Sequence, residues 1–123
     1  MLRGIRGATT VVNNDRQEIL ASVGELLSAL VRENGIDVQD VGAVIFSSTP
    51  DINAAFPAAG ARAIGWSEVP LFGTQEIDCP TGVLHCIRVL ILCNTELDQR
   101  SVKHLYLRNA WVLRPDIMSS EKK

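Results

Sequence analysis

The sequence of 123 residues is poor in the residues on which disulfide, metal and covalent chemistry depend. It has three cysteines and two histidines. Cys79, Cys86 and Cys93 are odd in number, and their seven-residue spacing matches neither a disulfide framework nor a metal-binding motif. There is no Ser-His-Asp pattern and no glycine-rich phosphate loop. We therefore expect reduced, mostly buried thiols, no metal and no cofactor.

Long apolar runs, internal repeats and a strong charge of either sign are also missing. No stretch approaches the roughly 18 apolar residues of a membrane span, and the N-terminal segment does not resemble a signal peptide. The formal net charge of −2 disfavours nucleic acid as a partner. These absences predict one cytoplasmic domain over residues 1–123, without membrane contact and with a mobile tail at 118–123.

The clearest element that is present is a long amphipathic helix. Apolar residues recur at helical spacing on one face from Ile19 to Val31. Asp15, followed three residues later by Glu18, is typical of a helix start. Asn34-Gly35 is typical of a helix end. A helix with one apolar face requires a sheet to cover.

The remaining apolar segments predict that sheet. Expected strands are 2–12, 41–48, 69–76, 84–94 and 103–113, with a short helix at 56–65. The order of elements indicates an α/β or α+β fold with one main helix. Because the strands are apolar on both faces and no second long helix follows, we expect another copy of the chain to cover the second face.

Several charged and polar residues do not fit this apolar pattern. Arg88 interrupts the strand 84–94, yet its guanidinium keeps its proton and has five N–H donors to satisfy. Each such residue alone has a plainer explanation: the arginines reach water, the glutamate pairs with one of them, and the tyrosine belongs to the core. Together they suit a small molecule with several negative charges, which arginine binds through two parallel hydrogen bonds. The set is Arg6, Arg62, Glu76, Arg88, Tyr106 and Arg114.

Six segments then resemble one known family. They read RGIRGATTV, SSTPD, AFPA, VPLFGTQE, CIRV and HLYLRNAWVLRPD, and they run in the family's order from residue 3 to 116. The chain resembles the trimeric α/β class of chorismate mutase, as distinct from the all-helical class. The resemblance implies a mixed five-stranded sheet packed on one long helix. It also implies a homotrimer that forms a pseudo α/β-barrel, with active sites in the clefts between subunits.

The resemblance also implies a reaction and roles for four residues. An isomerase of this family converts chorismate to prephenate by a Claisen rearrangement, on the route to phenylalanine and tyrosine, without a cofactor. Arg88 matches the arginine that binds the ether oxygen and a carboxylate. Glu76 matches the acceptor for the ring hydroxyl. Arg6 and Tyr106 match the residues that bind the carboxylate of the side chain.

Further residues match the walls of the family's site, and two positions depart from its pattern. Gly73 stands where the family often has a cysteine, and Ala59 where it often has a lysine, so a weaker affinity for substrate is expected. The wall from the adjacent subunit would comprise Phe56, Arg62, Leu113 and Arg114, and the backbone would contribute Phe72, Gly73, Thr74 and Gln75.

Two other functions fit parts of the same pattern. An imine deaminase on a related trimeric scaffold would share the architecture and an arginine at the subunit interface. A carboxylate-binding module without catalysis would also use arginines in an apolar site. Glu76 together with Arg6 and Tyr106 suits a cyclohexadiene with two carboxylates better than a small imine.

Overall fold

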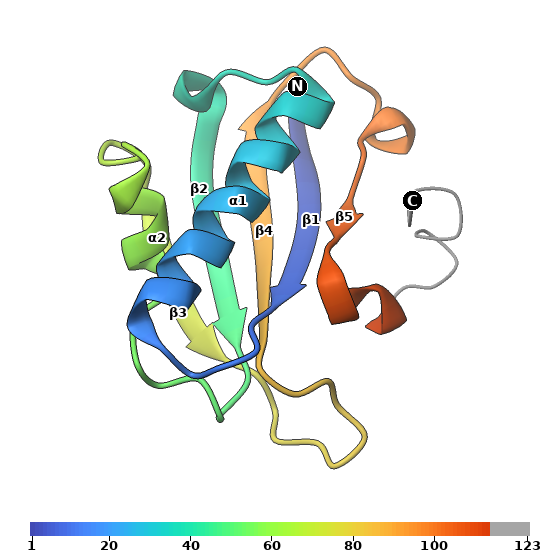
Figure 1. Ribbon diagram of the computed structural model, residues 1–123. Helices are drawn as coiled ribbons and strands as arrows, with labels where there is room; N and C mark the ends of the chain where they lie inside the picture. The colour runs from blue at the N-terminus through green and yellow to red at the C-terminus, as the bar shows by residue number, and fades with distance from the viewer. Residues whose placement is uncertain (114–123) are drawn as a thin grey trace.

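The computed structural model describes residues 1–113, and both Arg114 and the expected tail at 118–123 lie outside this range. A long helix packs across one face of a mixed five-stranded sheet with the strand order β3-β2-β4-β1-β5 (Figure 1). The α/β fold expected from the sequence is confirmed. The strands are β1 (Leu2–Thr10), β2 (Val41–Ser48), β3 (Leu71–Gln75), β4 (Cys86–Asn94) and β5 (Leu105–Tyr106). The helices are α1 (Arg16–Asn34), α2 (Ala58–Ala63) and the short 3₁₀ segments η1 (Val38–Asp40), η2 (Gln99–Ser101) and η3 (Arg108–Leu113).

Helix α1 begins and ends where the sequence predicts. The Asp15 carboxylate accepts a hydrogen bond from the backbone N–H of Glu18 at 3.0 Å. The Glu18 carboxylate in turn accepts from the backbone N–H groups of Val12 and Asn13. At the other end Gly35 adopts a left-handed conformation with φ of 58°. Both caps therefore bond backbone groups that the helix itself leaves unpaired.

The core lies between α1 and the sheet. Gly7 lets α1 approach β1 closely, because a Cβ there would lie 2.7 Å from Cδ1 of Leu30. Along β4 the odd-numbered residues from Ile87 to Cys93 are buried on this side, whereas Arg88, Leu90 and Leu92 point the other way and are partly exposed. From Ile87 to Cys93 this strand is thus fully buried on one face only, and the guanidinium lies on the open face.

The fifth strand is much shorter than the predicted 103–113. Only Leu105–Tyr106 is extended, and η3 follows. The strand stops because Arg108 has φ of 53° and turns its guanidinium back towards α1, where Nη2 lies 3.0 Å from a Glu25 carboxylate oxygen. The sequence allowed for a bulge at residues 108–110 within a longer strand, but it did not predict this turn. It brings Ala110 against Tyr106 in a small cluster on the second face of the sheet.

Candidate active site

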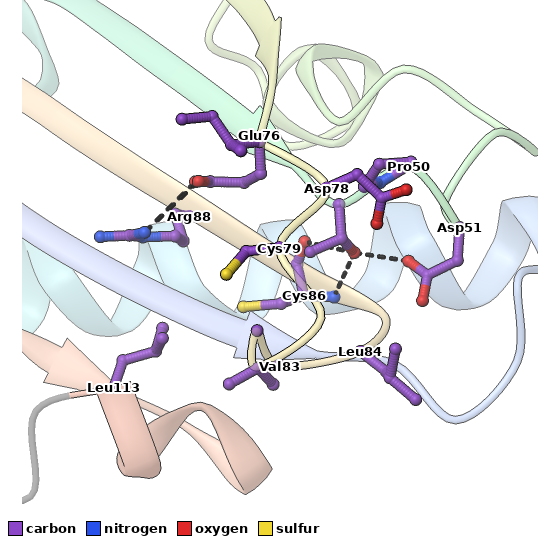
Figure 2. Close-up of a pocket in the computed structure, with 13 residues that line it drawn as sticks. Pro50, Asp51, Glu76, Asp78, Cys79, Val83, Leu84, Cys86, Arg88 and Leu113 are labelled. Atoms are coloured by element: carbon purple, nitrogen blue, oxygen red, sulfur yellow. Dashed lines mark hydrogen bonds and ion pairs between the residues drawn. The ribbon is translucent and has the colours of Figure 1, made fainter.

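An ion pair between Arg88 and Glu76 lies at the centre of the open sheet face. Arg88 is on the central strand β4, opposite Ala8 of β1 and Ser47 of β2. Glu76 follows β3 directly, and its backbone N–H donates to the Ser48 carbonyl at 2.9 Å. That bond extends the β2–β3 ladder by one residue and holds the Glu76 carboxylate 3.4 Å from Nη1 of Arg88 (Figure 2). Within one chain, then, Glu76 is the ion-pair partner of Arg88.

Arg6 and Tyr106 border the same region. A cavity of about 280 Å³ is lined by Arg6, Glu76, Arg88 and Tyr106, with Ile45 and Leu90 as apolar walls. Neighbouring strands bring these residues together, because Arg6 is opposite Leu90 and Ala8 is opposite both Arg88 and Tyr106. The structure therefore gathers all four residues to which the resemblance assigned catalytic roles.

A second hollow of about 530 Å³ meets the first at the ion pair. Arg88 and Glu76 line both. The second hollow continues beneath the connection between β3 and β4, past Cys79 and Cys86, to Leu113 (Figure 2). Leu113 of the same chain is thus close to the site, although the resemblance places it on the adjacent subunit.

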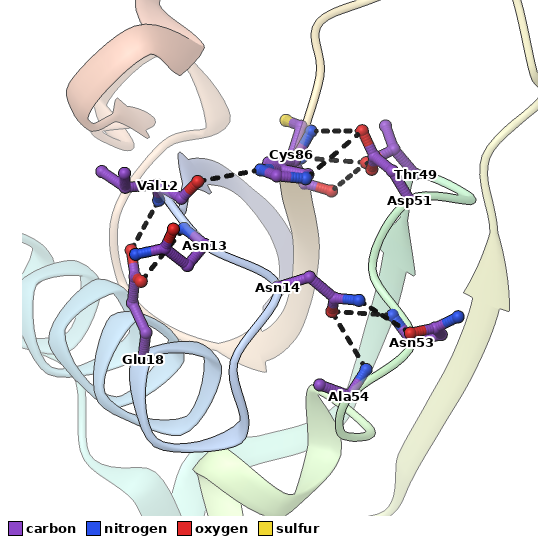
Figure 3. A network of polar contacts seen from close by, with 10 residues as sticks. Val12, Asn13, Asn14, Glu18, Thr49, Asp51, Asn53, Ala54 and Cys86 are labelled. Carbon is purple, nitrogen blue, oxygen red and sulfur yellow. Dashed lines mark hydrogen bonds and ion pairs between the residues drawn. The ribbon is translucent and has the colours of Figure 1, made fainter.

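Asp51 anchors the start of β4, and the sequence analysis did not single it out. Its carboxylate accepts hydrogen bonds from the Thr49 hydroxyl at 2.5 Å and from the backbone N–H of His85 at 3.0 Å. The Cys86 N–H donates to Thr49 Oγ1 at 2.9 Å, and the His85 ring lies 3.2 Å from the Val12 carbonyl (Figure 3). The network joins three loops at one end of the sheet. The only signal in the sequence was the Thr-Pro-Asp turn within SSTPD.

The pKa of Asp51 follows from this network. Burial raises it, but the hydrogen bonds from Thr49 and the His85 N–H, together with the charge of His85, outweigh burial and leave the pKa below its ordinary value. Asp51 is therefore a carboxylate at neutral pH and acts as an acceptor that fixes the loop. It is not suited to be a proton donor.

Two of the residues expected from the adjacent subunit, Phe56 and Arg62, line a separate groove together with three of the expected backbone positions. Its volume is about 900 Å³, and no residue that lines it also lines either hollow. Phe72 does not belong to the groove; it is opposite Ile45 on the open sheet face and is 64% exposed. Within a single chain, the groove is therefore separate from the cavity that contains Arg88. The predicted residues in the groove are Phe56, Arg62, Gly73, Thr74 and Gln75.

Comparison with known proteins decides the family. The family model described as chorismate mutase type I matches residues 2–117. The chain belongs to the chorismate mutase type I family. It is 42% identical over 118 residues to chorismate mutase AroH of Bacillus subtilis, with 95% of this chain and 93% of that protein covered. It is 44% identical over 122 residues to chorismate mutase AroH of Thermus thermophilus, covering 98% of this chain and all of that protein.

A solved structure supports the same assignment. A chorismate mutase from Clostridium thermocellum is similar with a TM-score of 0.87 and 43% identity, over 89% of this chain and 97% of that one. The fold and the family predicted from the motifs are therefore confirmed.

Residues 1–113 were also compared with the requirements of a metal site and of a membrane-spanning helix. Within residues 1–113, no three side chains of His, Cys, Asp and Glu are grouped so that they could hold a metal ion. No helix in that range is both long and apolar enough to cross a membrane.

The three cysteines differ in exposure and in the pKa of their thiols. Burial raises the pKa of Cys86 to about 11, although the Arg88 charge partly offsets it. Burial also raises the pKa of Cys93. Cys79 is exposed, and hydrogen bonds with the Thr81 side chain and backbone lower its pKa. The expectation of mostly buried thiols is right for two of the three.

We therefore predict one fast-reacting thiol per chain. At pH 8, maleimide should modify Cys79 first, because only the thiolate reacts and this thiol is exposed with a lowered pKa. Cys86 and Cys93 should react only after unfolding. Mass spectrometry of the labelled native protein would check this, with Cys79→Ser as the control that abolishes the fast reaction. Early labelling of Cys86 would contradict the prediction.

Proposed function

We propose that this chain is an active chorismate mutase that converts chorismate to prephenate, in the cytoplasm, on the route to phenylalanine and tyrosine. The observation that carries the proposal is the meeting of Arg6, Glu76, Arg88 and Tyr106 at one cavity on the open sheet face. Membership of the type I family supports the same reaction. The substrate is a dianion with an ether oxygen and a ring hydroxyl, and the cavity offers two guanidiniums, a phenol and one carboxylate for these groups.

Arg88 is proposed to stabilise charge that grows during the reaction. As the C–O bond of chorismate breaks and the new C–C bond forms, negative charge develops on the ether oxygen. A guanidinium donor at that oxygen lowers the barrier, because its interaction is stronger in the transition state than in the ground state. The contact with Glu76 at 3.4 Å restrains the guanidinium before substrate arrives. Both Glu76 oxygens lie within 3.5 Å of Nη1 of Arg88, and a remaining lone pair of the carboxylate is proposed to accept a hydrogen bond from the ring hydroxyl.

Arg6 and Tyr106 are proposed to hold the carboxylate of the enolpyruvyl side chain over the ring. An acceleration of about 10⁶-fold needs roughly 8 kcal/mol. Orientation of a flexible reactant can supply several of these, and one preorganised donor at the developing charge supplies about 3–4 kcal/mol more. The reaction thus needs neither a proton transfer nor a covalent intermediate, which agrees with the lack of an activated nucleophile in the sequence.

A homotrimer is proposed to complete the site. The face that carries Arg88 also carries the partly exposed apolar residues Ile45, Leu90 and Leu92, and no helix in residues 1–113 covers them. An apolar sheet face of this kind is stable when another surface covers it. The groove with Phe56 and Arg62, separate from Arg88 within one chain, would then meet the cavity of a neighbouring chain, with Arg114 closing it.

The decisive test is turnover of chorismate by the purified protein. Chorismate absorbance should disappear and prephenate should accumulate without any added cofactor. A parallel assay with a small imine should give no ammonia, which separates the mutase from a deaminase of similar architecture. A folded, assembled protein that does not consume chorismate would refute the proposal, and tight binding of chorismate without turnover would favour the carboxylate-binding alternative.

A further inference from the structure

The groove of about 900 Å³ contains a cation that neither the sequence analysis nor the proposed mechanism uses. Arg16, the first residue of α1, lines it together with Arg62 of α2. No aspartate or glutamate is among the lining residues. Within residues 1–113 neither guanidinium has an ion pair or a hydrogen bond. Two uncompensated positive charges therefore share one concave surface, in a chain whose net charge is −2.

A hydrogen-bonded clamp fixes Arg16 at this groove. The Asn14 side chain accepts from the backbone N–H groups of Asn53 and Ala54, each at 3.0 Å, and donates to Asn53 Oδ1 at 2.7 Å (Figure 3). Asn53 and Ala54 themselves line the groove. The start of α1 is thus tied to the groove wall two residues before Arg16.

The location of Arg16 is unfavourable for the helix itself. The N-terminal end of a helix carries partial positive charge, so a cation in the first turn is repelled, whereas Glu18 in the same turn is attracted. Arg16 also has no anionic partner to offset this repulsion. A contribution to the stability of α1 therefore does not account for an arginine at this place.

We infer that Arg16 acts with Arg62 to draw the carboxylates of the substrate into the groove and on to the cavity of the neighbouring chain, which the proposed trimer brings beside it. This inference rests on the proposed function, because the anion it concerns is chorismate. Arg16 is a steering residue that acts before the chemical step. Positive charge in a concave surface raises the local concentration of an anionic substrate and its rate of association, and salt weakens the effect.

The test compares two variants that lower the net charge equally. Arg16→Gln removes the groove charge, and Arg32→Gln removes a charge from the far end of the same helix, where Arg32 is paired with Glu33 at 3.5 Å. At about 10 mM ionic strength, kcat/KM for chorismate should fall about three- to tenfold in Arg16→Gln and less than twofold in Arg32→Gln. The change in Arg16→Gln should be in KM, and it should shrink below twofold at about 300 mM salt.

Reversing the charge of Arg16 separates steering from a structural role, because the two roles predict different changes in melting temperature and kcat/KM. Arg16→Glu should raise the melting temperature by about 1–3 °C, because it suits the helix end, while it lowers kcat/KM further than Arg16→Gln. Equal kcat/KM values for Arg16→Gln and Arg32→Gln at low salt would overturn the inference. So would a loss in Arg16→Gln that high salt does not reduce.

Failure of the proposed mutase function can be distinguished from failure of the inference about Arg16. If the wild-type protein does not consume chorismate, the mutase proposal fails by itself. Binding of isophthalate, an unreactive dicarboxylate, to wild type and to both variants would then test the groove by NMR. Saturable shifts of the Arg62 side-chain signals in wild type and Arg32→Gln, weakened in Arg16→Gln, would support the anion site; their absence in wild type would overturn it.

Discussion

Replacing Arg88 with alanine should lower kcat for chorismate by about a thousandfold or more. The reason is that, in the proposed mechanism, this guanidinium opposes the charge that develops on the ether oxygen as the C–O bond breaks. Arg88→Lys should recover only a small part of the loss, because a lysine ammonium lacks the planar fork that can bind two oxygens at once. Steady-state kinetics on both variants would measure this.

Stability should separate this role from a structural one. The ion pair is 46% exposed on the Arg88 side chain and 24% on that of Glu76, and partly solvated pairs contribute about 0–1 kcal/mol. Arg88→Ala should therefore unfold at nearly the wild-type temperature and keep its oligomeric state. Near wild-type activity in a folded Arg88→Ala protein would show that the residue is not catalytic. Arg100→Ala, at an exposed arginine of η2, is the matched control for loss of one charge.

Gly60→Ala should destabilise the protein by about 1–2 kcal/mol, although alanine is the better helix former by about 1 kcal/mol. A Cβ at residue 60 would lie 2.6 Å from Cβ of Val23 and 3.0 Å from the Leu20 carbonyl oxygen. Neither atom is the flexible end of a side chain, so α2 must move away from α1, and overpacking of this kind costs about 1–3 kcal/mol. Thermal or urea unfolding of the variant would measure the loss.

Two further variants test the cause. Gly42→Ala should leave stability unchanged, since the nearest atom to its new Cβ is the Leu92 carbonyl oxygen at 3.7 Å. The double variant Gly60→Ala with Val23→Gly removes both obstructing Val23 atoms, Cβ at 2.6 Å and Cγ1 at 2.9 Å, and should be about 1 kcal/mol more stable than the sum of the two single changes predicts. Strict additivity would mean that Val23 is not the obstacle.

The elements with a regular hydrophobic period, or with residues typical of a start or an end, were predictable from the sequence. Helix α1 was fixed by its apolar face, by Asp15 and by Gly35, and β2 coincides with the predicted 41–48. The predicted length of the fifth strand was wrong, because no glycine or proline marks an end to the strand between Tyr106 and Leu113. The turn that ends it depends instead on a positive φ at Arg108 and on the contact of this residue with the distant Glu25. Tertiary contacts of that kind leave no local pattern.

The candidate site was predictable to a similar degree. Period-2 alternation along a strand predicts that Arg6 shares a face with Ala8, and Arg88 with Leu90, and the strand pairing agrees with this. The residues alone gave no way to know that β1 and β5 flank the site as neighbours, which brings Tyr106 to Arg6. Nor did they reveal the Asp51 network or Arg16, since each depends on loops that meet only in the folded chain.

The pairing of β1 with β4 has a consequence for how activity arises during folding. Leu2 is opposite Asn94 and Thr10 is opposite Cys86, so the first strand to be synthesised has no antiparallel partner until most of the chain exists. Contacts between such distant segments require closure of a long loop, and they form late and slowly. Arg6 and Arg88 stand on these two strands. The candidate active-site cavity therefore cannot exist before β1 and β4 pair, and the proposed activity should appear in a single step with the closing of the sheet.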